Sequence, residues 1–222
     1  MLIRWEALGF ILGQFLLALA AAMLVPIAWG MIFGGGGLPA LMGSALLTAG
    51  CGGSLLMALP RPERELKQRE ALMLVVLAWF LAAGFGALPF IWSGSFVSVT
   101  DAVFESASGM TTTGATILND VEVLSEPIQL WRHLTHWLGG MGIVLLGIAV
   151  LPLVGHGGMS LYRAEFSGAK SEKLNPRIAE TAFSLYKLYV AFTLAERVAV
   201  RLAGMAWFEA VCHARSTVGT GG

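Results

Sequence analysis

Long apolar runs alternate with short polar segments along the chain. Residues 7–29, 40–59 and 71–92 carry no charged side chain, and two later runs, 131–153 and 178–204, are apolar at most positions. A helix of about 20 apolar residues crosses the hydrocarbon core of a bilayer, which is roughly 30 Å thick. The pattern therefore predicts an all-α integral membrane protein in which these runs are spanning helices.

Composition supports this prediction and argues against other classes of protein. Only 13% of the 222 residues are charged, whereas a soluble domain averages about 25%. Fourteen basic residues balance fourteen acidic ones, so we expect no nucleic acid as a partner. The apolar runs predict that the partner of this surface is membrane lipid. The sequence contains no nucleophile–base pair and no phosphate-binding loop, and we expect neither an enzyme nor a cofactor.

The basic residues predict which side of the membrane each loop occupies. Loops 60–70 and 154–177 hold four basic residues each, and none lies between Ser93 and Leu130. Short basic loops stay in the cytoplasm. We therefore expect a multi-pass protein of the inner (cytoplasmic) membrane, with its N-terminus and both basic loops in the cytoplasm and residues 93–130 outside.

A threonine-rich stretch between two apolar runs is unsuited to a spanning helix. It consists of Thr111, Thr112, Thr113, Gly114, Ala115 and Thr116. Thr100 or Asp101 can cap a short helix over about 101–110, whose negative end would point at this stretch. Extended backbone at membrane depth presents oxygens that replace water around an alkali cation. We interpret residues 111–116 as an ion selectivity filter, with an ordinary extracellular loop as the alternative.

The same pattern recurs 108 residues later. With this offset Ala102, Val103, Ser108, Thr112 and Gly114 fall on identical residues, the last two on Thr220 and Gly222. These are five identities in the fourteen positions 101–114. Internal repeats are common in transport proteins. The repeat predicts a unit of span, pore loop and span, with a second filter that contains Thr220, Gly221 and Gly222.

Several segments together resemble one known family. Residues 104–118 (FESASGMTTTGATIL) resemble the first pore loop of the Trk/Ktr/HKT potassium transporter superfamily, and residues 130–142 (LWRHLTHWLGGMG) resemble the helix that follows it in the Trk membrane subunit. The first long cytoplasmic loop of that subunit is resembled by residues 158–165 and by residues 174–181. The start of its second pore loop is resembled by residues 203–222.

The resemblance implies four span–loop–span units around a pseudo-fourfold pore, preceded by an extra helix pair. Residues 1–59 would supply that pair, 71–153 the first repeat, and 178–222 an incomplete second repeat ending in its filter. The chain would then be the N-terminal part of the subunit, truncated after about one and a half repeats.

The resemblance also implies potassium uptake. Backbone carbonyls of Thr112, Thr113, Gly114 and Gly222 would bind K⁺. The full-length subunit would form a homodimer and bind a cytosolic nucleotide-binding regulatory subunit.

Some residues depart from this pattern or admit a second role. Arg197, Arg201 and Arg215 lie where the family usually has apolar or aromatic residues, which favours the alternative of a non-conducting membrane fragment that only associates with other transporter subunits. Glu105 either adds negative potential to the ion path or is a structural acid behind the filter. His133 and His136 are spaced to share a metal, but packing is the favoured role because no acid accompanies them.

Overall fold

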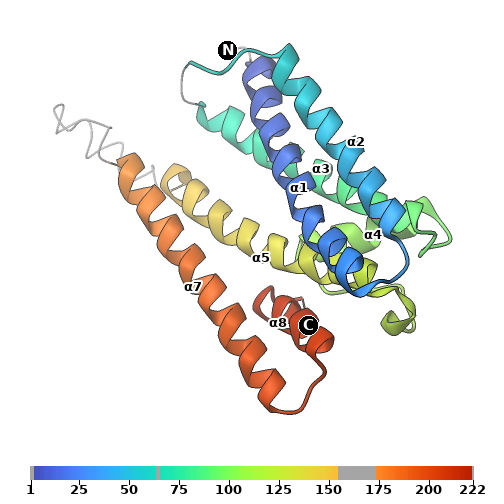
Figure 1. The fold of residues 1–222 in the computed structure, drawn as a ribbon. Coiled ribbons are helices and arrows are strands. Elements are labelled where there is room, and N and C mark those ends of the chain that lie inside the picture. Colours follow the sequence, from blue (N-terminus) through green and yellow to red (C-terminus); the bar gives the residue numbers. More distant parts are fainter. Residues whose placement is uncertain (1–2, 64–65, 155–173, 222) are drawn as a thin grey trace.

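The structure is a computed structural model that describes residues 3–63, 66–154 and 174–221 (Figure 1). Most of the second basic loop and Gly222 lie outside the described residues. The described part consists of helices, one of them a short 3₁₀ turn (η1), and contains no strand. The helices are α1 (Trp5–Phe33), α2 (Leu38–Ala58), α3 (Gln68–Trp92), α4 (Val99–Met110), η1 (Val121–Val123), α5 (Glu126–Val154), α7 (Leu174–Leu202) and α8 (Trp207–Val218).

Three of the described helices can cross a membrane by length and composition: Trp5–Phe33, Leu38–Ala58 and Arg69–Trp92. Helix α5 contains the later run 131–153 and α7 contains all but the last two residues of the run 178–204; the 29 residues of each helix reach about 43 Å. The expected all-α membrane fold is confirmed.

Helices α1 and α2 form a tightly packed antiparallel pair. A turn of four glycines, residues 34–37, reverses the chain between them, and Gly37 adopts a left-handed conformation with φ of 84° just before α2. Near the middle of the pair, a Cβ atom added to Gly13 would lie 3.0 Å from the main-chain oxygen of Gly52. Small residues therefore let the two backbones approach closely.

Hydrogen bonds fix both ends of this pair to the rest of the fold. At one end the main-chain N–H of Arg4 donates to Glu70 at 3.1 Å, and the Arg4 guanidinium donates to the same carboxylate at 2.9 and 2.6 Å. At the other end the Ser125 hydroxyl donates to the Gly36 carbonyl at 2.7 Å. The start of α1 therefore lies beside the start of α3, and the α1–α2 turn lies beside the start of α5.

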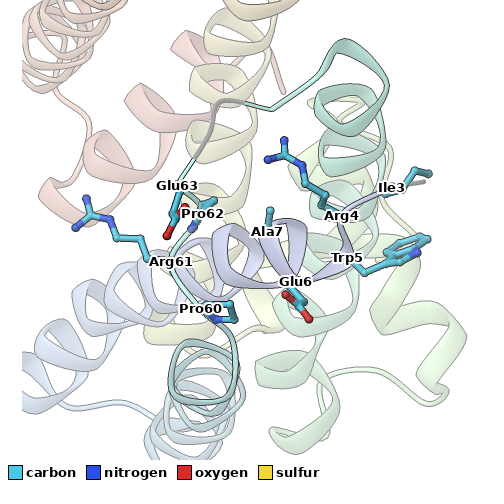
Figure 2. Close-up of a pocket in the computed structure, with 9 residues that line it drawn as sticks. All are labelled: Ile3, Arg4, Trp5, Glu6, Ala7, Pro60, Arg61, Pro62 and Glu63. Atoms are coloured by element: carbon cyan, nitrogen blue, oxygen red, sulfur yellow. The ribbon is translucent and has the colours of Figure 1, made fainter. Parts of the chain in front are cut away.

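A pocket of about 720 Å³ opens beside the Arg4–Glu70 pair. Figure 2 shows its lining, which comes from the start of α1 and from the linker after α2. The polar residues in this lining are Arg4, Glu6, Arg61 and Glu63. The pocket thus lies at the end of the molecule that carries the first basic loop.

Helices α4 and α8 are too short to cross a membrane. Each has 12 residues, which reach about 18 Å, and their bounds differ by the 108-residue offset found in the sequence. The hydroxyl oxygen of Ser98 caps α4 by accepting a hydrogen bond from the Asp101 N–H at 3.1 Å. The expected cap at Thr100 or Asp101 is therefore wrong, because the helix begins earlier and both residues lie in its first turn.

Helix α5 runs between the two halves of the molecule (Figure 1). It contacts α1, α3 and α4 on one side and α7 and α8 on the other. Trp131 on α5 is fully buried, and its indole N–H donates to the Gly86 carbonyl of α3 at 2.9 Å. Because one helix carries the contacts to both short helices, the positions of α4 and α8 depend on α5.

Candidate ion-selectivity site

A hydrogen-bonded turn ends α4 and directs the chain into the threonine-rich stretch. The N–H of Thr111 donates to Ala107 at 2.9 Å, that of Thr112 to Gly109 at 3.0 Å, and that of Thr113 to Ser108 at 2.9 Å. Thr112 has a φ of 55°, which is uncommon for a residue other than glycine. The residues after this turn lie outside the helix, so their carbonyls are not used by its hydrogen bonds.

The same turn ends α8. The N–H groups of Gly219, Thr220 and Gly221 donate to Arg215, Thr217 and Ser216 at 3.1, 2.9 and 2.9 Å. Each of these bonds is the 108-residue counterpart of a bond after α4, and Thr220 has a φ of 59°. The offset found in the sequence therefore describes backbone geometry as well as residue identity.

The two segments that follow these turns lie side by side at Gly114 and Gly221. A Cβ atom added to Gly114 would lie 3.1 Å from the Gly221 carbonyl carbon and closer still to its oxygen. Gly114 also has a φ of 75°, which disfavours any residue with a side chain. We call residues 111–116 the first strand and residues 220–222 the second strand, in the sense of a filter segment and not of a β-strand; of the second the structure describes only Thr220 and Gly221.

The carbonyl oxygens of Thr112, Thr113 and Gly114 accept no hydrogen bond within the described part of the chain. Ala115 differs, because its carbonyl accepts from the Ser108 hydroxyl at 2.5 Å. The side chains at the two ends of the first strand are also engaged, since the hydroxyl of Thr111 donates to Ala107 and that of Thr116 to Glu105. The middle of the first strand thus offers oxygens to a ligand, and its ends fix it to α4.

Glu105 supports the first strand from behind. Its carboxylate is buried, and it accepts hydrogen bonds from the Thr116 hydroxyl at 3.0 Å and from the Ile117 N–H at 3.4 Å. The Arg132 guanidinium donates to its other oxygen at 2.6 Å. Of the two roles considered for Glu105, the geometry fits the structural acid, because Arg132 balances its charge and its contacts with Thr116 and Ile117 are hydrogen bonds.

Helix α5 packs against the base of both strands. On one side, a Cβ atom added to Gly139 would overlap the Met110 carbonyl at the end of α4. On the other, a Cβ atom added to Gly140 would lie 3.0 Å from the Cα of Gly219, and one added to Gly219 would lie 2.7 Å from the His136 carbonyl oxygen. Side chains larger than glycine at these positions would push the turns away from α5.

The two histidines of α5 form hydrogen bonds with nearby groups of the protein. Nδ1 of His133 forms a hydrogen bond with the Ser216 hydroxyl, and Nδ1 of His136 lies 3.0 Å from the Arg132 carbonyl. No cluster of three or more potential metal-binding side chains exists in the described ranges. The geometry therefore gives no support to a shared metal.

The three unusual arginines all make local contacts. The Arg197 guanidinium stacks on the Trp207 ring at 4.2 Å, Arg201 donates to the Met205 carbonyl at 3.3 Å, and Arg215 donates to the Val211 carbonyl at 3.0 Å. Arg197 thus packs against the first residue of α8, and Arg215 lies in its last turn. These contacts place two positive charges on or beside the second short helix.

Sequence reasoning missed the role of Arg132. It singled out Glu105 but not its partner, which lies 27 residues away. The available signal was that Arg132 is the one arginine or lysine in the apolar run 131–153. A buried arginine requires an acid partner, and Glu105 precedes it in the same repeat.

Comparison with known proteins identifies the family. Residues 38–222 match the family model described as TrkH, cation transport protein. The chain is 42% identical to the Trk system potassium uptake protein TrkH of Halomonas elongata over 214 residues, covering 96% of this chain and 44% of that protein. It is 40% identical over 221 residues to the protein of the same name from Escherichia coli K12, covering 99% and 46%.

A solved structure agrees with these relatives. The crystal structure of the potassium transporter TrkH from Vibrio parahaemolyticus superposes with a TM-score of 0.84 at 35% identity, covering 97% of this chain and 43% of that one. The chain therefore spans a little under half the length of the relatives it matches. The expected resemblance is confirmed, and the chain belongs to the TrkH family of cation transport proteins.

Proposed function

We propose that this chain contributes part of the ion pathway of a Trk-type potassium uptake transporter, and that its two strands form part of the selectivity filter. The observation that carries the proposal is the pairing of the strands at Gly114 and Gly221, each at the end of a short helix. Carbonyl oxygens held side by side in this way can replace the water around a cation.

The two short helices add an electrostatic contribution. Their C-terminal ends lead into the strands, and the C-terminus of a helix carries about half a negative elementary charge. Because the negative ends of both α4 and α8 adjoin the strands, a cation is favoured there over an anion. Glu105 contributes position rather than net charge, since Arg132 balances it.

Potassium is the ion named for the relatives, and we extend it to this chain. The proposed ligands are the carbonyl oxygens of Thr112, Thr113 and Gly114 in the first strand and of Gly222 in the second. Transport would occur in the inner membrane, with the N-terminus in the cytoplasm. The proposed partners are a second copy of the full-length subunit and a cytosolic nucleotide-binding regulatory subunit.

A chimera tests this function. Residues 1–222 replace the matching part of the Escherichia coli relative, and the chimera is expressed in a bacterium that lacks its own potassium uptake systems. We expect growth on limiting potassium and uptake of rubidium, a potassium substitute. A chimera that reaches the membrane in normal amounts but transports no rubidium would contradict the proposal.

A second candidate function is favoured by the arginines of the second repeat. Arg215 lies in the last turn of α8, where its positive charge opposes the negative helix end that a cation needs. In this alternative the chain associates with other transporter subunits without conducting. The Arg215→Ala chimera separates the two, because loss of the charge should leave uptake equal or higher if the second strand conducts. Uptake absent in both the Arg215→Ala and the parent chimera favours the non-conducting alternative.

A further inference from the structure

We propose that His136 is a positioning residue for the second strand, with Nε2 accepting a hydrogen bond from water held against that strand. This inference rests on the proposed function, because the strand matters to transport only as part of the filter. It assigns to one side chain of α5 a role in ion selectivity that is separate from packing.

His136 contacts the second strand and the turn before it through both its main chain and its ring. A Cβ atom added to Gly219 would lie 2.7 Å from the His136 carbonyl oxygen. A Cβ atom added to Gly221 would overlap Cδ2 of the ring and lie 2.6 Å from Cγ and 2.8 Å from Nε2. The imidazole is thus the surface against which the strand lies.

The other ring nitrogen fixes the hydrogen-bonding character of Nε2. Nδ1 lies 3.0 Å from the Arg132 carbonyl oxygen, which can only accept a hydrogen bond. Nδ1 therefore carries the hydrogen, and in the neutral ring Nε2 presents a lone pair. The tautomer follows from this one contact.

Nε2 itself is buried and has no hydrogen-bond partner within the described part of the chain. Buried polar atoms in folded proteins almost always have a partner. The N–H groups of Thr220 and Gly221 already donate to Thr217 and Ser216. Because the ring lies against the strand at Gly221, we assign the donor that Nε2 requires to water held between the ring and the second strand. A strand held by such a bond has a defined carbonyl position, which is what ion selectivity needs.

His133 provides an internal comparison. It lies one turn earlier on α5 and is also buried, but it uses Nδ1, which bonds the Ser216 hydroxyl in α8. The two histidines therefore contact the same pore loop through different nitrogens. His133 binds the helix, and His136 faces the strand that follows it.

Amide substitutions distinguish these nitrogens, because the glutamine amide occupies the position of Nε2 and the asparagine amide that of Nδ1. The variants are His136→Gln and His136→Asn, with His133→Gln and His133→Asn as the reciprocal pair, all made in the chimera described above. The measurements are rubidium uptake, its inhibition by sodium, and the amount of protein in the membrane.

At position 136 we expect glutamine to preserve the preference for rubidium over sodium. We expect asparagine to reduce that preference roughly tenfold, the size expected when one buried hydrogen bond is lost.

At position 133 the order should reverse, with asparagine closer to the parent than glutamine. The inference is overturned if glutamine and asparagine at 136 give the same selectivity, or if both lower only the amount of protein, since a packing role predicts either result. A parent chimera that transports nothing would instead refute the proposed function, and with it this inference.

Discussion

Arg132 and Glu105 form a buried salt bridge that joins α5 to α4, with Nε of Arg132 2.6 Å from Oε1 of Glu105. The side chains are 9% and 1% exposed. Through its other oxygen Glu105 accepts hydrogen bonds from Thr116 and Ile117, at the end of the first strand. The bridge therefore connects α5 to the candidate filter through a single carboxylate.

Breaking this bridge should destabilise the protein and disturb the first strand. Glu105→Gln leaves Arg132 buried without a counter-charge, which typically costs about 3–5 kcal/mol in the free energy of unfolding. We expect a lower thermal unfolding temperature of the purified chimera and reduced rubidium uptake. The double variant Glu105→Gln with Arg132→Met removes both charges and should recover most of the lost stability.

Glu122→Gln is the matched control for this prediction, because Glu122 is exposed and lies outside both short helices. It should leave stability and uptake unchanged. Equal unfolding temperatures for Glu105→Gln and Glu122→Gln would show that the bridge contributes nothing to the fold.

The orientation in the membrane predicts which residues are accessible from each side. Val123 is 78% exposed in the segment expected outside, and Arg61 is exposed in the first basic loop. In a background without Cys51 and Cys212, an impermeant thiol reagent added to intact cells should label Val123→Cys and not Arg61→Cys. Permeabilised cells, in which both should react, are the control. The opposite labelling pattern in intact cells would reverse the proposed orientation.

Residues 1–222 expressed alone should not support potassium uptake. The resemblance implies four pore loops around the pore, and replacing the hydration shell of an ion requires oxygens on all sides. We expect a potassium-uptake-deficient bacterium to grow on limiting potassium only when the remaining part of the Escherichia coli relative is co-expressed. Growth with residues 1–222 alone would indicate that copies of this chain assemble the pore among themselves.

The fold class and the repeat could be predicted from the sequence because both depend on short-range patterns. Apolar runs of spanning length indicate helices directly, and the 108-residue offset emerged from only five identities. That offset relates α4 to α8 and each hydrogen bond of one terminal turn to its counterpart. The cap of α4 was missed because Ser98, Thr100 and Asp101 are all good capping residues within four positions.

The contacts that build the candidate site could not be predicted in this way, because they join distant residues. Gly114 meets Gly221 across 107 positions, and His133 meets Ser216 across 83. Two roles for Glu105 are equally compatible with the sequence, and its contacts with Arg132 and Thr116 distinguish them. Side-chain hydrogen bonds likewise decide which carbonyls of the first strand are free to bind an ion. The bond from the Ser108 hydroxyl to the Ala115 carbonyl is an example.

The central claim, that the two strands select potassium, is tested most directly at Gly114. Gly114→Ser places a Cβ atom against the Gly221 backbone at a residue with a φ of 75°. Gly94→Ser is the matched control, because Gly94 has a φ of 68° but no atom within 4 Å of an added Cβ.

The decisive measurement is the preference for rubidium over sodium in the two chimeras. It is obtained from rubidium uptake with and without competing sodium, at equal amounts of membrane protein. We expect Gly114→Ser to lower the preference for rubidium at least about tenfold, the loss that follows when an interaction of about 1.4 kcal/mol is removed. Gly94→Ser should match the parent. Unchanged uptake and selectivity in Gly114→Ser would contradict the assignment of these strands to the filter.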